Sequence, residues 1–137
     1  DGIYTSTLIR SKQTAEVISK ITKIPIKKSF KELDEYESPY ITNGLTRLTS
    51  TRLRALKNLL KEISKNKSKD KTILIVAHGR TNRIIMAHLL QIPIGKHLMR
   101  LVQHNTGLSV LAWNKTYKNW TLESMNEISH IPKRLKN

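Results

Sequence analysis

The clearest pattern of hydrophobic and polar positions lies in the middle of the chain, over residues 72–90. The uninterrupted apolar run Ile73–Ala77 predicts a strand that is covered on both faces. Residues 82–90 then carry the apolar spacing of a helix. His78 and Gly79 therefore fall at a turn from a strand into a helix.

The beginning of the chain shows the same order of elements. Residues 3–5 predict a short strand, and Ser6 or Thr7 is the predicted N-cap of the helix that follows. That helix is marked by a set of apolar residues, namely Leu8, Ala15, Val17, Ile18 and Ile21. Residues 24–26 predict a second short strand, and the stretch after it, to residue 44, predicts a long loop because it has no sustained period.

Further along, residues 45–65 predict an amphipathic helix, and residues 93–99 predict a short helix or turn. Two strands are expected at residues 107–113 and 119–126, joined by a polar hairpin turn over 114–119. Alternating strands and helices favour an α/β fold, a three-layer α/β/α sandwich with a mostly parallel sheet.

Length and composition exclude several classes of protein. A chain of 137 residues predicts a single domain over residues 1–137. No apolar run approaches the length needed to cross a bilayer, so we expect a soluble chain without a membrane partner. The absence of cysteine excludes disulfides and thiol nucleophiles and fits the reducing cytoplasm.

The net charge of +15 would attract nucleic acid, an acidic membrane or a phosphorylated small molecule. The lysine runs at residues 27–28 and 61–71 have no interleaved aromatic residues, so stacking on single-stranded nucleic acid is poorly supported. We therefore expect no specific nucleic-acid partner. A nucleic-acid binder would lose affinity steeply with salt and ignore phosphomonoesters.

Two predicted turns bring chemically useful side chains to the same edge of the sheet. Arg10 falls near the first turn of its helix, and His78 follows its strand directly. Ligands of parallel sheets bind outside the carboxyl ends of the strands, where helix N-termini offer free N–H groups. Arg10, His78 and the Gly79 amide thus form a candidate site for a phosphoryl group, and Glu32 could supply a proton.

Each of these residues also has an ordinary structural interpretation. His78 could be a hydrogen-bonded structural histidine, and Arg10 an ordinary surface arginine. Glu32 lies in a charged run, KELDE, which is usually just solvated. We expect no metal ion and no cofactor, because the five histidines show neither i, i+4 pairing nor nearby carboxylates; they are His78, His88, His97, His104 and His130.

Taken in order, these segments resemble the histidine phosphatase superfamily, which includes the cofactor-dependent phosphoglycerate mutases. IYTSTLIRSKQTAEVI is similar to that family's segment of strand, Ser, Arg and Gln-Thr-Ala. KEL is similar to its acidic loop motif, and ILIVAHGRTNRII to its second histidine motif. HNTGLSVLAW and WTLESMNEISHI resemble its closing strands, so the likeness covers nearly the whole chain.

The resemblance implies a role for each candidate residue and a phosphoglycerate mutase-like fold. Arg10 would be the second phosphate-binding arginine, His78 the second active-site histidine and Glu32 the proton donor. Residues 34–44 depart from the family's Gly-x-Trp-Glu-Gly pattern, which leaves Glu35 and Glu37 as alternatives for the acid.

In the family, the first histidine of an Arg-His-Gly motif attacks phosphorus and becomes phosphohistidine. That motif does not occur in residues 1–137. The chain also begins at Asp1, close to a predicted strand, so we expect an N-terminally truncated domain that lacks the family's first, central strand.

The resemblance predicts a phosphomonoesterase, with a phosphoglycerate mutase as an alternative, and a fragment that is inactive by itself. A small phosphorylated substrate or inorganic phosphate is the expected ligand. Without the central strand, the strand that ends at Ala77 would have an unpaired edge, so a homo-oligomer is expected, with direct pairing of the neighbouring strands as the alternative. The alternative from a different class is a non-catalytic module that binds phospho-ligands or protein.

Overall fold

The structure is a computed structural model that describes residues 1–36, 47–65, 70–94, 98 and 100–135. The chain divides into two compact units, Asp1–Thr81 and Asn82–Asn137. The predicted single domain over residues 1–137 stays a prediction. No helix in the described part of the chain is long and apolar enough to cross a membrane.

The first unit contains a three-stranded parallel sheet. Its strands are β1 (Gly2–Ser6), β2 (Ile26–Phe30) and β3 (Ile73–Val76), and their order across the sheet is β2-β1-β3. No described strand pairs with the outer edge of β3. The predicted α/β class with a mostly parallel sheet is confirmed.

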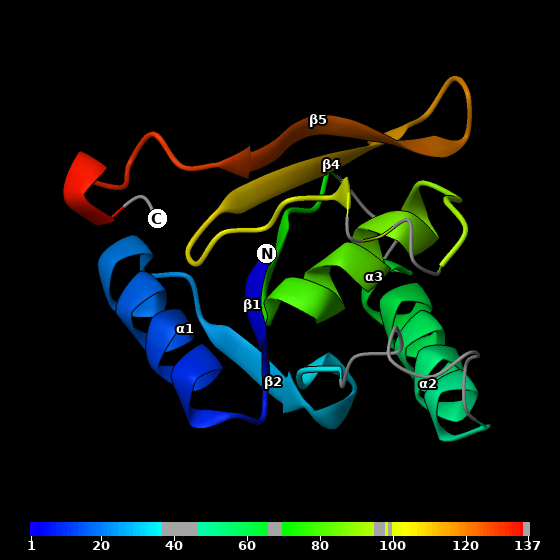
Figure 1. The fold of residues 1–137 in the computed structure, drawn as a ribbon, viewed down its shortest axis with the longest axis horizontal. Coiled ribbons are helices and arrows are strands. Elements are labelled where there is room, and N and C mark those ends of the chain that lie inside the picture. The colour runs from blue at the N-terminus through cyan, green and yellow to red at the C-terminus, as the bar shows by residue number, and fades with distance from the viewer. Residues whose placement is uncertain (37–46, 66–69, 95–97, 99, 136–137) are drawn as a thin grey trace. The chain divides into compact units, whose positions relative to one another are not determined.

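Helices lie on both faces of this sheet. Figure 1 shows α1 (Ile9–Thr22) beside β1 and β2, and the Thr5 hydroxyl contacts Ser11 of α1. Tyr4 points to the opposite face because side chains alternate along a strand. There it lines a pocket together with Ile63 from α2 (Arg47–Ser64).

The predicted elements at the start of the chain are confirmed with shifted boundaries. The second strand covers Ile26–Phe30 rather than residues 24–26, and a short 3-10 helix, η1 (Lys31–Leu33), follows directly. The loop predicted there was therefore wrong for residues 27–33. The physical reason is tertiary, since β1 offers a parallel partner as far as Phe30, and a local pattern cannot show that pairing.

Helix α1 buries little of its apolar pattern. Ala15 is fully buried, but Val17 and Ile21 are 59% and 75% exposed. The buried side is completed by Ser11, whose hydroxyl is used in a hydrogen bond. In α2, by contrast, Leu56, Leu60 and Ile63 are buried as the spacing predicts.

Helix α3 (Gly79–Leu89) begins three residues earlier than its apolar spacing predicts. His78 is therefore the residue directly before the first helical position. In the second unit, β4 (Leu108–Asn114) and β5 (Asn119–Glu127) form the predicted antiparallel hairpin, with Trp113 paired to Trp120. A short 3-10 helix, η3 (Lys133–Leu135), follows. The turn predicted at 93–99 lies partly outside the described residues.

Candidate active site

The carboxyl ends of β1 and β3 bring Ser6 and His78 together. In the parallel register Thr5 pairs with Val76, so Ser6 and the residues after Val76 leave the sheet at the same edge. The Ser6 hydroxyl oxygen lies 2.8 Å from Nε2 of His78, and it accepts a hydrogen bond from the Leu8 amide at 3.2 Å. His78 is only 6% exposed. The imidazole is thus fixed by a buried hydroxyl group.

The surroundings of His78 favour the neutral imidazole. Burial lowers the pKa of His78 from 6.5, because a low-dielectric environment disfavours the charged form. The positive charge of Arg10 lowers the pKa further, while Glu35 and Asp34 act in the opposite direction. The charge of Arg10 therefore acts on His78, the other residue predicted to bind the phosphoryl group.

Two further hydroxyl groups, those of Thr5 and Ser11, form hydrogen bonds next to the carboxyl ends of β1 and β3. The Thr5 and Ser11 hydroxyl oxygens are 2.6 Å apart, and the Ser11 hydroxyl donates to the Val76 carbonyl. Thr5 and Ser11 are both buried. This chain of hydrogen bonds joins β1, α1 and β3, and it holds the start of α1 next to the carboxyl end of β3.

Asp34 connects the segment after η1 to both turns. Its carboxylate accepts hydrogen bonds from the Thr7 amide at 2.7 Å and from the Thr7 hydroxyl at 2.8 Å. Its backbone carbonyl accepts from the Thr81 hydroxyl at 2.8 Å and from Arg52 at 3.3 Å. Asp34 therefore positions the β1–α1 turn and the start of α3 relative to each other.

Glu35 lies at the N-terminus of α3. Its carboxylate accepts a hydrogen bond from the Arg80 amide at 3.2 Å, and its charge raises the pKa of His78. The Arg80 side chain donates to the Tyr36 carbonyl at 3.1 Å. Arg80 thus contacts the segment of Glu35 and Tyr36 through both its amide and its side chain. The N-terminus of α3 thus already binds one anionic group, because the Arg80 amide donates its hydrogen bond to the Glu35 carboxylate.

Tyr36 packs under a cation next to this carboxylate segment. The guanidinium carbon of Arg52 lies 4.1 Å from the centre of the Tyr36 ring, a cation–π geometry. Burial raises the pKa of Tyr36, Arg52 lowers it and Glu32 raises it. Its hydroxyl group is buried and has no hydrogen-bond partner among the described residues.

The predicted site residues occupy these positions. Arg10 is exposed in the first turn of α1, and Gly79 opens α3. Glu32 is half-buried in η1, where its charge acts on Tyr36, whereas the carboxylates that act on His78 are Glu35 and Asp34. The role of Glu32 stays a prediction, and Glu37 lies outside the described residues.

The predicted N-cap was wrong. The N-cap of α1 is Leu8, and no side chain caps the helix. The Ser6 hydroxyl is instead engaged by His78, and the Thr7 hydroxyl by the Asp34 carboxylate. Both candidate capping groups are therefore engaged in long-range contacts, and no side-chain cap hydrogen bond forms at the first turn of α1.

Sequence reasoning missed Ser6 and Asp34 as parts of the site. Ser6 was assigned to the helix cap, although its position directly after a strand was a usable signal for the same edge as His78. Asp34 gave no such signal, because its role depends on the fold that brings it to Thr7. In the described residues, no group of three or more metal-ligating side chains could hold a metal ion.

The second unit has its own histidine contact. The side-chain nitrogen of Asn126 lies 2.6 Å from Nδ1 of His104, and the Asn126 side-chain oxygen accepts from the His104 amide at 2.8 Å. Asn126 has φ = 51°, and a Cβ at Gly107 would lie 2.4 Å from its side-chain oxygen. A side chain at position 107 would therefore displace the Asn126 side chain from its present place.

The arrangement at the Ser6–His78 edge suits an anionic tetrahedral group. When the Ser6 hydroxyl donates to Nε2, the neutral imidazole of His78 carries its proton on Nδ1, which is then a donor. Arg10 supplies a charged donor, and the first turns of α1 and α3 contain no acidic residue. Donors and positive helix ends thus face one edge of the sheet.

A family model described as "Histidine phosphatase superfamily (branch 1)" matches residues 42–128, more than half of the chain. The matched stretch includes His78 and Gly79 but not Arg10 or Glu32. No curated protein matches the sequence.

Solved structures share the fold. A phosphoserine phosphatase mutant from Entamoeba histolytica in complex with phosphoserine has a TM-score of 0.67 at 19% identity, over 96% of this chain and 76% of its own. The α-ribazole phosphatase from Shigella flexneri has a TM-score of 0.70 at 19% identity, over 93% of this chain and 73% of its own. A mycobacterial glucosyl-3-phosphoglycerate phosphatase with inorganic phosphate has a TM-score of 0.68 at 17% identity, over 92% of this chain and 76% of its own.

Proposed function

Because the chain belongs to the histidine phosphatase superfamily (branch 1), we propose that it binds the phosphoryl group of a small phosphomonoester at the Ser6–His78 edge and serves its hydrolysis. The buried His78, fixed by Ser6 and electrostatically coupled to Arg10, is the observation that carries this proposal. Phosphatases with the same fold that hold phosphoserine or inorganic phosphate support the ligand class.

In this proposal Arg10, His78 and the Gly79 amide donate hydrogen bonds to the phosphoryl oxygens. A guanidinium group can donate two parallel bonds to one phosphate, and each charge-assisted bond is stronger than a neutral one. A neutral His78 donates through one nitrogen and keeps Ser6 on the other. The lowered pKa of His78 supports this division of the two ring nitrogens.

We propose that hydrolysis runs through phosphohistidine. A histidine nitrogen attacks phosphorus, the P–O ester bond breaks, and the leaving alkoxide takes a proton from a carboxylic acid. Water then attacks the phosphorus of the phosphohistidine and gives its proton to the carboxylate, and the P–N bond breaks, which frees the histidine and releases phosphate. The nucleophile would belong to an Arg-His-Gly segment outside residues 1–137, so the chain alone should bind phosphate without turnover.

The proton donor in this scheme is Glu32, with Glu35 and Glu37 as the alternatives. The family resemblance of KEL favours Glu32. The geometry favours Glu35, because its charge acts on His78 and its carboxylate reaches the N-terminus of α3. Glutamine variants at positions 32 and 35, made in a chain extended upstream to an Arg-His-Gly segment, separate these two, since only loss of the true donor should slow the release of a poor leaving group.

The binding proposal is tested by titrating phosphate into the protein while following the imidazole signals of His78 by NMR. Arg10→Gln should weaken binding by about tenfold or more, because a charge-assisted hydrogen bond is lost. Lys20→Gln, in the last turn of the same helix, is the charge-matched control and should change little. Unchanged affinity in Arg10→Gln would remove Arg10 from the site.

The enzyme proposal is tested on a chain extended upstream to an Arg-His-Gly segment. Turnover of p-nitrophenyl phosphate by the extended chain supports a phosphatase, and transfer between sugar-acid hydroxyls supports the phosphoglycerate mutase alternative. An upstream sequence without the motif supports the non-catalytic phospho-ligand or protein-binding module.

We also propose a cytoplasmic location, because the absence of cysteine supports a reducing compartment.

We also propose that copies of the chain associate through β3. Its outer edge pairs with no described strand, and its four residues Ile73–Val76 are all apolar. An apolar strand with unpaired N–H and C=O groups is a template for pairing with another chain.

A further inference from the structure

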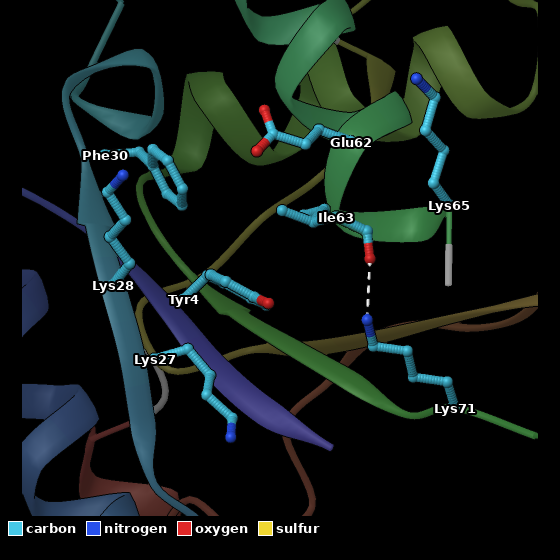
Figure 2. A pocket seen from close by; sticks show the side chains of 8 residues that line it. All are labelled: Tyr4, Lys27, Lys28, Phe30, Glu62, Ile63, Lys65 and Lys71. Atoms are coloured by element: carbon cyan, nitrogen blue, oxygen red, sulfur yellow. Dashed lines mark hydrogen bonds between the residues drawn. The ribbon is translucent and has the colours of Figure 1, made fainter. Parts of the chain in front are cut away.

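A pocket of about 440 Å³ lies on the face of the sheet opposite α1. Figure 2 shows that its lining comes from β1, β2, the end of α2 and the segment before β3. The lining contains four lysines, one carboxylate and three apolar or aromatic side chains: Lys27, Lys28, Lys65, Lys71, Glu62, Tyr4, Phe30 and Ile63. The pocket is therefore strongly positive.

An irregularity in β2 brings two successive lysines to this pocket. Ile3 pairs with Ile26 and Tyr4 pairs with Lys28, so Lys27 is an extra residue without a partner on β1. In a regular strand neighbouring side chains point to opposite faces, but a bulge redirects one of them. Both lysines consequently line the same pocket.

Gly2 allows Lys27 to lie across β1. A Cβ at position 2 would lie 2.4 Å from Cγ of Lys27 and 2.9 Å from its Cε. Any larger residue at position 2 would force the lysine stem away from the strand. The glycine at the start of β1 and the bulge in β2 thus act on the same lysine.

The pocket also has an aromatic wall. The rings of Tyr4 and Phe30 are 6.0 Å apart and tilted, and the Lys28 ammonium lies 4.9 Å from the centre of the Phe30 ring. The Lys71 ammonium donates a hydrogen bond to the Ile63 carbonyl at 3.1 Å and so satisfies a backbone acceptor at the end of α2. Glu62 is the one carboxylate among the lining residues.

We propose that this pocket binds a small polyphosphate ligand, at a site separate from the Ser6–His78 edge. Several phosphate groups would neutralise the cluster of ammonium groups, and the half-buried rings of Tyr4 and Phe30 would pack against a planar group attached to them. The volume is that of a small-molecule pocket, and an extended nucleic-acid strand would need a longer groove. The pocket shares no residue with the Arg10–His78 site. Lys71 precedes β3, whereas His78 follows it.

The test uses the only phenylalanine of the chain, Phe30, as a reporter. Incorporation of 4-fluorophenylalanine gives a single fluorine NMR signal, and inorganic triphosphate is titrated into the protein at physiological salt. We expect a saturable shift of this signal. The double variant Lys27→Gln with Lys71→Gln should weaken triphosphate binding by about tenfold or more.

The control is Lys20→Gln with Lys57→Gln, which removes the same charge from exposed positions outside the pocket. An equal loss of affinity in this control would show general charge attraction and overturn the proposal, as would a silent Phe30 signal. Affinity that rises with the length of an oligonucleotide would also overturn it, in favour of strand binding. Arg10→Gln should leave the triphosphate titration unchanged, so failure here and failure of the phosphoryl site are distinguishable.

Discussion

The Ser6 hydroxyl oxygen lies 2.8 Å from Nε2 of His78, although 72 positions separate the two residues in the chain. Ser6 ends β1 and His78 follows β3, and the parallel pairing of these strands makes them neighbours. A buried imidazole needs a partner for each polar nitrogen that is removed from water. Ser6 supplies one partner, and the bound phosphoryl group is proposed as the other.

Ser6→Ala should destabilise the fold and weaken phosphate binding together. It leaves Nε2 of His78 buried without its partner, at a cost of about 1–3 kcal/mol in the free energy of unfolding. Urea unfolding followed by far-UV circular dichroism measures the change, because both tryptophans lie in the second unit. Ser64→Ala, which removes an exposed hydroxyl at the end of α2, is the matched control and should cost much less. Equal losses in both variants would argue against a special role for the Ser6 contact.

His78 should make stability fall as the solution is acidified. Its pKa in the fold is lower than 6.5, so the unfolded chain takes up a proton first as the pH drops through 6.5. The unfolded state then binds more protons, and the free energy of unfolding decreases toward lower pH. His78→Gln should flatten this slope, and the difference between the two proteins removes the contribution of the other histidines. An unchanged slope in His78→Gln would contradict the prediction.

The carboxylates near His78 should differ in their effect on its pKa. Glu35→Gln and Asp34→Asn should lower the pKa of His78 further, because each removes a negative charge that stabilises the imidazolium form. Arg10→Gln should raise it. Glu32→Gln serves as the control, since Glu32 acts on the pKa of Tyr36 and should leave that of His78 in place. NMR titration of the His78 ring protons measures all four variants. If Glu32→Gln shifted the pKa of His78 as much as Glu35→Gln does, Glu32 would also act on His78 and the prediction would be contradicted.

Self-association should depend on protein concentration. A monomer has a mass of 15.8 kDa, and pairing through the outer edge of β3 should give dimers at micromolar concentration. Sedimentation velocity over a dilution series detects the exchange between monomer and dimer. A single species of monomer mass at every concentration would reject association through this edge.

Local patterns were sufficient to locate the elements that carry their period in their own sequence, although every residue of β3 is half-buried and the strand is not fully covered on both faces as predicted. The apolar run that became β3, the amphipathic spacing of α2 and the two strands of the hairpin all carry their period in neighbouring residues. The order of strand, turn and helix also placed Arg10 and His78 at turns after strands, since parallel strands end at a common edge. These features need no knowledge of distant contacts.

The rest depended on tertiary pairing. β2 continues to Phe30 because β1 lies beside it, although Ile26 to Phe30 shows no clear strand pattern. Ser6 and Thr7 fit a helix cap by residue type, but their hydroxyls are claimed by His78 and Asp34, which only the fold brings near. The sequence by itself thus determined the α/β class and the residue types at the strand ends. Only the tertiary structure decided which hydroxyl holds the histidine and which carboxylates act on it, because hydrogen bonds and charge interactions depend on distance in space rather than on position in the chain.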